Sequence, residues 1–252
     1  MAEYRKYLRN QTLKGMTEME TGFSKGLPIP PLQKPYPSGG MLIDLPSHEA
    51  CRALTSVALS DAIAHRESRR TFSEEAITLE ELSFLLWATQ GVRGFVRDGL
   101  VTLRNVPSGG GMHPFETYIA VHNIEGLKPG LYRYLAVEHQ LLLEHEASEG
   151  LGSQLIEIAN GQPWAGNGAA TFVWSTRPPR TEYRYGDDSL KDILISAGHI
   201  CQNLYLACEG LGLGTCAIVA YQQEPLDKLL GVDGDEEIAL YLAPVGRPKP
   251  EA

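Results

Sequence analysis

The stretch SLKDILISAGHICQNLYLACE, residues 189–209, decides the fold class of this chain. Its apolar residues recur at spacings of three and four, which predicts one long helix that ends at Gly210. Because the apolar stripe is wide, we expect a central helix buried between a sheet and a further layer. The stripe consists of Leu190, Ile193, Leu194, Ala197, Cys201, Leu204, Tyr205 and Cys208.

Alternating apolar and polar residues elsewhere predict the strands of that sheet, over residues 117–122, 131–136, 141–143, 171–175 and 238–243. The first two are separated by turn residues, Glu125-Gly126 and Pro129-Gly130, and we expect them to form a hairpin. Hairpin strands mixed with helices are typical of an α+β fold rather than of repeated βαβ units.

Two further helices are expected before the first strand. One begins at Pro46-Ser47 and reaches about His65. The other has Thr78 and Glu81 at capping-box spacing and ends at Gly91.

The segment before residue 46 differs from the rest of the chain. It holds five prolines between residues 28 and 37, which remove backbone donors and keep the chain extended. We therefore divide the chain into an extended Pro-rich arm, residues 1–45, and one domain, residues 46–252. The arm is either a loose leader or an element that packs on a partner subunit, and the sequence leaves both open.

Composition excludes several classes of protein. Apolar residues make up 43% of the 252 positions and charged residues 21%, which permits a packed core. A net charge of −9 argues against a general nucleic-acid-binding protein, because such proteins need an excess of Lys and Arg. No apolar run is long enough for a membrane span or a signal peptide. The four cysteines are too widely spaced for a disulfide framework or a zinc cluster, so we expect a reduced, cytoplasmic protein without a metal site.

The segment Arg66-Glu67-Ser68-Arg69-Arg70 has the donors that a phosphate monoester needs. In an extended chain, Arg66, Ser68 and Arg70 lie on one side and the two residues between them on the other. Two guanidinium groups around a hydroxyl match a phosphate in charge and shape. The alternative is a solvated basic turn.

Three other segments are candidates for ligand contacts. Pro107-Ser108-Gly109-Gly110-Gly111 can bring backbone N–H groups close to a ligand, or it is a flexible loop. Gly210–Thr215 follows a helix and lacks a sixth-position glycine, so it is not a dinucleotide fingerprint. It remains either a turn that faces a planar ligand or a helix cap. Arg180–Tyr185 is expected to form a polar, aromatic loop whose tyrosines contact substrate or anchor the loop.

A series of short motifs runs through the chain in a fixed order, over roughly residues 60–248. The motifs are R-x-S-x-R at 66–70, Leu85–Ala88 before Gly91, P-S-G-G at 107–110, E-x-Y at 116–118, G-L-Y-x-Y at 130–134, G-H-x-x-Q-N-L at 198–204, G-L-G at 212–214 and V-G-x-P at 245–248. Together they resemble the nitroreductase superfamily and, within it, the SagB-type dehydrogenase branch, whose best-known members oxidise azolines to azoles in modified peptides.

The resemblance implies an FMN-dependent oxidoreductase with a nitroreductase-like α+β fold, a central mainly antiparallel sheet flanked by helices. It also implies a homodimer with flavin sites at the subunit interface and hydride transfer through flavin N5. Arg66 and Ser68 are implied to hold the FMN phosphate together with Arg247. Arg70 is implied to lie near the pyrimidine end of the flavin, where a cation stabilises charge on the reduced ring.

The resemblance further implies two sets of contacts with the flavin ring, and it makes NAD(P)H a candidate electron donor. One set comes from the other subunit and lines the isoalloxazine ring and the ribityl chain. The second set is a turn with a backbone N–H near N5. The two sets are Pro107, Ser108 and Gly109, and Gly212, Leu213 and Gly214.

One departure from the branch concerns catalysis. Peptide-azoline oxidases carry a Lys-Tyr pair ahead of the central helix, where this chain has Arg184-Tyr185. Arginine keeps its proton and cannot act as a general base, but it can bind a carboxylate or a carbonyl. Arg184 and Tyr185 are therefore the candidate catalytic pair, and the substrate, a small molecule or a modified peptide, stays open. The alternatives are an NAD(P)H-dependent nitroreductase or quinone reductase, a non-catalytic flavin-binding protein, and a flavin-dependent dehalogenase or ring-cleaving enzyme.

Overall fold

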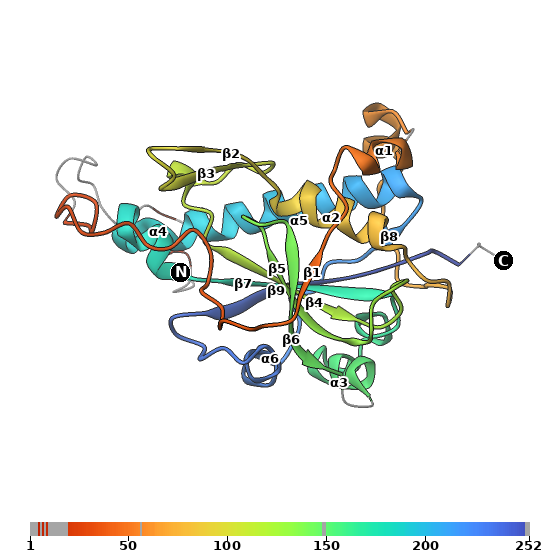
Figure 1. The fold of residues 1–252 in the computed structure, drawn as a ribbon. Helices are drawn as coiled ribbons and strands as arrows, with labels where there is room; N and C mark the ends of the chain where they lie inside the picture. The colour runs from red at the N-terminus through yellow and green to blue at the C-terminus, as the bar shows by residue number, and fades with distance from the viewer. Residues whose placement is uncertain are drawn as a thin grey trace.

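A seven-stranded sheet in the order β1-β6-β5-β4-β7-β9-β8 forms the centre of the computed structural model, which describes residues 5, 7, 9, 20–55, 57–147 and 150–249 (Figure 1). All pairings between its named strands are antiparallel, so the predicted α+β fold with a mainly antiparallel sheet is confirmed. The strands are β1 (Leu42–Asp44), β4 (Phe115–Val121), β5 (Gly130–Leu135), β6 (Gln140–Glu146), β7 (Ala170–Thr176), β8 (Gly214–Thr215) and β9 (Ile238–Gly246).

The five predicted strands correspond to β4, β5, β6, β7 and β9, and β4 and β5 form the predicted hairpin, with Val121 opposite Gly130. A second, two-stranded sheet was not predicted. It pairs β2 (Val92–Val96) with β3 (Val101–Arg104) and projects from the body near α5 (Figure 1). Its turn places Arg97 and Asp98 at positive φ, a conformation that side-chain patterns do not reveal.

Alternate residues of the strands face two separate hydrophobic cores. Ile119 and Val121 of β4 belong to the core under α2 (Leu79–Gln90) and α5 (Ser189–Leu211). Tyr118 and Ala120 belong to the core under α3 (Leu151–Ile158) and α6 (Gln223–Leu230). Figure 1 shows these helix pairs on opposite faces of the sheet. Because side chains alternate along β4, this strand contributes residues to both hydrophobic cores.

Helix α5 is the predicted central helix, with two differences. It continues past Gly210 to Leu211, and it ends where Gly212 adopts a left-handed φ of 68° and donates its N–H to helix carbonyls. In its N-terminal half, Leu190 and Leu194 of the predicted buried stripe are 43% and 50% exposed. Half of α5 thus presents apolar side chains that the described residues of its own chain do not cover.

Helix α2 begins with the predicted capping box. Thr78 Oγ1 accepts a hydrogen bond from the Glu81 N–H at 3.1 Å, and Glu81 Oε2 accepts one from the Thr78 N–H at 2.9 Å. Gly91 follows the helix as expected, but its φ is −55°, so it is not a left-handed cap. A Cβ at Gly91 would lie 2.4 Å from Trp87 Cδ1, which explains the glycine by close approach.

The single helix predicted from Pro46 to about His65 is wrong in its start and continuity, although a helix does end at His65. The chain instead forms a 3₁₀ turn, η2 (Ala50–Leu54), an extended residue at Thr55 and a short helix, α1 (Leu59–His65). β-branched residues such as Thr55 and Val57 lose side-chain freedom in a helix, which favours the break.

The loop predicted at Arg180–Tyr185 is also wrong. These residues belong to helix α4 (Pro178–Tyr185), which a 3₁₀ turn, η5 (Gly186–Asp188), connects to α5. Two prolines stand in the first turn of α4, where a missing N–H removes no helical hydrogen bond.

The Pro-rich segment lies against its own chain. Arg133 donates to the carbonyls of Lys34 at 2.8 Å and Pro35 at 3.3 Å, and Arg104 donates to that of Leu32 at 3.0 Å. From residue 20 onward, the described part of the arm is therefore hydrogen-bonded to its own subunit. The sequence had suggested either a loose leader or an element that packs on a partner subunit. Most of residues 1–19 lie outside the described residues, and the division at residue 45 stays a prediction.

The remaining elements are two 3₁₀ turns, η3 (Gly109–Gly111) and η4 (Pro163–Ala165). Among the described residues, no helix combines the length and the apolar character that crossing a membrane requires.

Candidate functional site

Residues 66–70 bring the predicted phosphate donors together beside the C-terminal half of α5. Arg66 and Ser68 both face Tyr205: the Arg66 guanidinium lies 5.4 Å from the centre of its ring, and Ser68 Oγ lies 2.9 Å from its hydroxyl. The alternation expected for an extended segment therefore holds for these two residues.

The two residues between the predicted donors form ion pairs instead of contacting Tyr205. Arg69 pairs with the neighbouring Glu67 and, at 3.2 Å, with Glu209 of α5. Its backbone N–H donates to the Thr215 carbonyl at 3.0 Å, which fixes the segment along β8. Arg69 is thus neutralised locally and leaves the other side of the segment to Arg66 and Ser68.

Arg70 lies close to Ser68 but is exposed. Its guanidinium is 5.5 Å from the centre of the Trp164 ring and donates to the Ser68 carbonyl at 3.4 Å. Burial raises the pKa of the Cys216 thiol, and the positive charge of Arg70, followed by the polar groups of Ser68 and Arg70, opposes that rise, so both residues border this thiol. No carboxylate among the described residues pairs with Arg66 or Arg70.

Arg247, implied to complete the phosphate site, has acidic partners of its own in this structure. Its guanidinium donates to both carboxylate oxygens of Glu81, at 3.0 and 2.9 Å, and to the Ala76 carbonyl at 3.3 Å. A second acid, Glu75, lies 3.5 Å away. The side chain implied to complete the phosphate site is therefore engaged at the N-terminus of α2, because the capping-box glutamate already supplies its counter-charge.

The glycine-rich loop packs against α4 and the start of α5. Ser108 Oγ accepts a hydrogen bond from the His113 N–H at 3.1 Å. A Cβ at Gly109 would lie 2.2 Å from Asp192 Oδ1, and one at Gly110 would lie 2.6 Å from Arg184 Cδ. Glycine is required at both positions by close approach, and at Gly110 also by a φ of 58°.

Arg184 and Tyr185 stand at the same loop. The Arg184 guanidinium lies 5.0 Å from the centre of the Phe23 ring and 5.9 Å from that of Tyr185. Its Nε and Nη1 are buried and find no acceptor among the described residues, and Asp192 Oδ2 is buried without a donor. Burial raises the pKa of Asp192, while a hydrogen bond from the Gly109 N–H lowers it. This end of α5 therefore holds polar groups with unused hydrogen-bonding capacity.

Two of the three amides in the turn after α5 already donate to carbonyls of the helix. The Gly212 N–H donates to the Glu209 carbonyl at 3.2 Å, and the Leu213 N–H donates to the Cys208 carbonyl at 2.8 Å. Gly214 lies in β8 opposite Gly246 of β9. These amides cap the helix and build the sheet edge, which corresponds to the helix-cap interpretation of the sequence.

The candidate residues thus fall into two groups along one helix. The phosphate-type group contacts Tyr205, and the loop with Arg184 contacts Asp192, thirteen residues earlier in α5. At 1.5 Å per residue the two groups are about 20 Å apart. Within one chain they do not form a single site.

Sequence reasoning missed Tyr205 and Asp192 as members of the two groups. Tyr205 was assigned to the buried stripe of the helix, although its hydroxyl contacts Ser68 and the Ala217 N–H. The available signal was a polar hydroxyl at an apolar stripe position, since a buried Tyr hydroxyl usually has a hydrogen-bonding partner. Asp192 carried no such signal, because a carboxylate in a first helical turn is ordinary.

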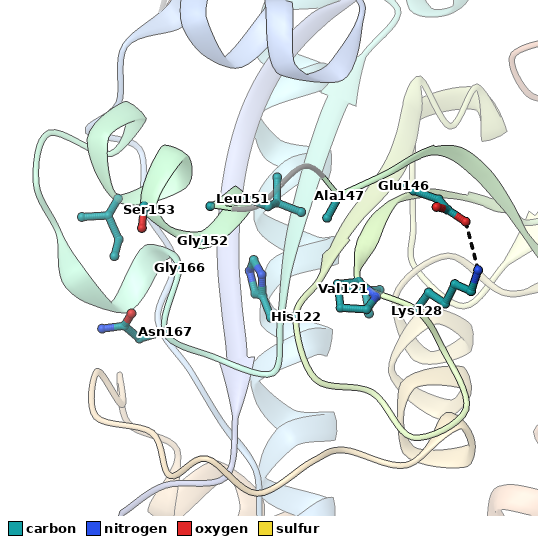
Figure 2. Close-up of a pocket in the computed structure, with 13 residues that line it drawn as sticks. Val121, His122, Lys128, Glu146, Ala147, Leu151, Gly152, Ser153, Gly166 and Asn167 are labelled. Carbon is teal, nitrogen blue, oxygen red and sulfur yellow. Dashed lines mark hydrogen bonds and ion pairs between the residues drawn. The ribbon is translucent and has the colours of Figure 1, made fainter.

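A cavity of about 620 Å³ is lined by residues of α3 and of the loops beside it (Figure 2). His122, Ser153 and the Lys128–Glu146 pair line it, and this pair spans 3.2 Å. Burial lowers the pKa of His122 to about 4, so the ring is neutral near pH 7. None of the predicted site residues lines this cavity.

Comparison with known proteins gives consistent matches. Residues 63–247 match the model of the Nitroreductase family. The chain is 31% identical over 210 residues to "Putative nitroreductase MJ1384" of Methanocaldococcus jannaschii, covering 82% of this chain and 96% of that protein. A second protein so described, from Ralstonia eutropha, has a crystal structure that superimposes with a TM-score of 0.68 at 25% identity, over 89% of this chain and all of that one.

The trifolitoxin-processing protein TfxB of Rhizobium leguminosarum is also similar, at 29% identity over 142 residues. That match covers 54% of this chain and 37% of TfxB.

Proposed function

The chain belongs to the nitroreductase family, whose members are oxidoreductases, and from this premise we propose that it is an FMN-dependent oxidoreductase of the SagB type that acts as a homodimer. FMN, when bound, supplies hydride transfer through its N5 atom. The chain's own residues bind the phosphate, orient the ring and hold the substrate.

The observation that carries this proposal is the division of the candidate site along α5. A two-fold axis across the exposed face of α5 would bring the C-terminal half of one copy to the N-terminal half of the other. Arg66 and Ser68 of one subunit would then meet Ser108, Gly109 and Arg184 of its partner. Exposed Leu194 and Ile195 lie on that face and would be buried by the same contact.

The donor set at residues 66–70 fits the FMN phosphate. Arg66 carries a positive charge with no acidic partner among the described residues, and Ser68 adds a hydroxyl on the same side. Charged fork-shaped donors with a neutral hydroxyl are the chemistry that a phosphate dianion requires. Arg70, which is exposed, is free to extend toward the pyrimidine end of the ring.

Arg184 is proposed to bind substrate and not to move a proton. Its unused Nε and Nη1 can donate to a carboxylate, a carbonyl or a nitro oxygen next to the ring. Tyr185, whose hydroxyl lies at Gly110, lines the same end. The relative TfxB is named for toxin processing, which supports a modified peptide as substrate, and MJ1384 is named as a nitroreductase, which supports a small molecule.

Flavin content tests this function. The purified chain, incubated with FMN and freed of excess, is expected to show flavin absorbance at about one FMN per subunit. Arg66→Ala and Ser68→Ala should each lower FMN retention. Arg69→Ala is the matched control, because Arg69 is already paired with Glu67 and Glu209. A wild-type chain that takes up no FMN would refute the proposal.

Turnover assays separate the candidate activities. NAD(P)H oxidation with nitroaromatic or quinone acceptors would identify a nitroreductase or quinone reductase. Activity restricted to azoline peptides would identify a SagB-type dehydrogenase. Bound flavin that dithionite reduces, but that no donor or peptide touches, would indicate a flavin-binding protein without catalysis.

A further inference from the structure

The Tyr205 hydroxyl connects three segments at the phosphate-type group. It accepts a hydrogen bond from the Ala217 N–H at 2.9 Å, just after β8, and it lies 2.9 Å from Ser68 Oγ. The face of the same ring lies under the Arg66 guanidinium. One side chain of α5 therefore touches both donors that the proposed FMN phosphate would use.

Counting donors and acceptors fixes one of these directions, at Ala217, whereas either hydroxyl can donate in the Tyr205–Ser68 pair. The Ala217 N–H can only donate, so the Tyr205 hydroxyl accepts there. The single proton of Tyr205 is available for Ser68 Oγ, and when Tyr205 donates it, the Ser68 proton is left for the neighbouring Cys216 thiol or for a bound anion. An anion at Ser68 can only accept, so its presence orders the chain as Ala217 N–H to Tyr205, Tyr205 to Ser68, and Ser68 to the anion.

The ring adds a second effect, on Arg66. A guanidinium without a carboxylate partner is otherwise free to move through solvent, and the aromatic face 5.4 Å away restricts it. Because α5 is long and packed on the sheet, the ring provides a rigid support. The Tyr205 side chain thus contacts both Arg66 and Ser68 and holds them on one side of the segment.

We propose that Tyr205 is a positioning residue that directs the Ser68 hydroxyl, and with it Arg66, onto the phosphate of FMN. This inference rests on the proposed function, and nothing in the comparisons assigns a role to Tyr205. A purely structural role, in which the hydroxyl only satisfies the Ala217 N–H, predicts no selectivity for the phosphate.

The test measures dissociation constants of FMN and riboflavin, which differ only by the phosphate, by flavin fluorescence with the full chain. Tyr205→Phe keeps the ring under Arg66 and removes only the hydroxyl. We expect Tyr205→Phe to raise the dissociation constant of FMN about tenfold, the effect of one hydrogen bond in a charged site. The dissociation constant of riboflavin should change less than about twofold. Tyr221→Phe is the matched control, since its hydroxyl donates to the Ala239 carbonyl elsewhere, at 3.0 Å.

A double-mutant cycle with Ser68→Ala tests whether Tyr205 acts through Ser68, and it needs no riboflavin binding. In the Ser68→Ala background, Tyr205→Phe should change FMN affinity less than about twofold. Independent, additive losses would overturn the inference, as would equal weakening of FMN and riboflavin or an unchanged FMN affinity. A wild-type chain that binds no FMN would instead remove the proposed function itself, so the two failures are distinguishable.

Discussion

Arg184 is partly exposed, but two of its guanidinium nitrogens, Nε and Nη1, are buried without acceptors among the described residues. Such groups are costly unless a ligand completes them, so we expect Arg184 to contact substrate. Arg184→Gln should lower kcat/KM for a nitroaromatic acceptor by about 10- to 100-fold, the loss of one charged hydrogen-bonding group. FMN content should stay unchanged. Steady-state kinetics of the flavin-loaded chain test this prediction. Arg184→Lys keeps the positive charge but loses the fork-shaped pair of donors, so its kcat/KM should lie between those of the wild type and Arg184→Gln.

His113 should make the folded chain less stable as pH falls. Burial, and then the nearby Arg104 guanidinium, lower the pKa of His113 to about 3. The unfolded chain binds a proton on this ring near pH 6.5 and the folded chain does not. The free energy of unfolding should therefore fall as pH drops below about 6.5, by up to about 1.4 kcal/mol per pH unit from this residue.

Urea unfolding at pH about 7 and about 5 measures this effect, and His113→Asn should remove about 2 kcal/mol of the difference. Asparagine tolerates the positive φ of 44° at this position. Burial lowers the pKa of His122 to about 4, so His122 contributes to the pH dependence in the same direction, and this contribution remains in the His113→Asn variant. The exposed His145→Asn is the control, and an equal pH dependence in all three proteins would contradict the assignment.

At this scale the sequence predicts contacts within a segment better than contacts between segments. The spacing of Arg66 and Ser68 follows from a period of two, and both side chains do share one side. The partner on that side, Tyr205, comes from a helix far along the chain, and no local pattern encodes such a pair. Arg247 shows the same limit, because its pairing with Glu81 depends on where β9 ends relative to α2.

At the scale of elements, one residue at the start of α2 both caps the helix and contacts the residue that follows β9. Glu81 caps the helix and also binds the Arg247 guanidinium. Arg247→Met should therefore lower the free energy of unfolding by about 1–2 kcal/mol and leave FMN affinity within about twofold. Denaturant titration and flavin binding measure the two effects. Glu81→Gln should give a similar loss of stability, whereas a tenfold loss of FMN affinity in Arg247→Met at unchanged stability would restore its implied phosphate role.

Elements were predictable where their signal is local. The Thr78–Glu81 capping box and the β4–β5 hairpin depend on residues a few positions apart, and both form as expected. Helix α4 was missed because its residues are polar and it takes its place from packing beside α5, which no periodicity in eight residues reveals. The end of α5 was misjudged at Gly210, because a single glycine inside a packed helix costs only about 1 kcal/mol.

For the whole molecule, α5 is the element that relates fold to function. Its buried side packs on the sheet, and its other side carries the proposed flavin groups at two places with apolar residues between them. The sequence could indicate the helix and each group separately. It could not show that the groups are about 20 Å apart in one chain, because that separation follows from which turns of the helix they contact.

A charge placed on the exposed face of α5 tests that arrangement. Leu194 is 50% exposed in one chain, and in a two-fold dimer each substitution appears twice in the interface. Leu194→Glu should yield monomers by light scattering, because it would bury an unpaired carboxylate at the contact. FMN content should fall together with the dimer, while the far-ultraviolet circular dichroism of the folded chain stays unchanged. Met41→Glu, at a 58% exposed methionine beside β1, is the matched control and should keep both the dimer and the flavin. A Leu194→Glu monomer that retains FMN would show that one subunit alone holds the flavin, since the half-sites of two copies could no longer meet.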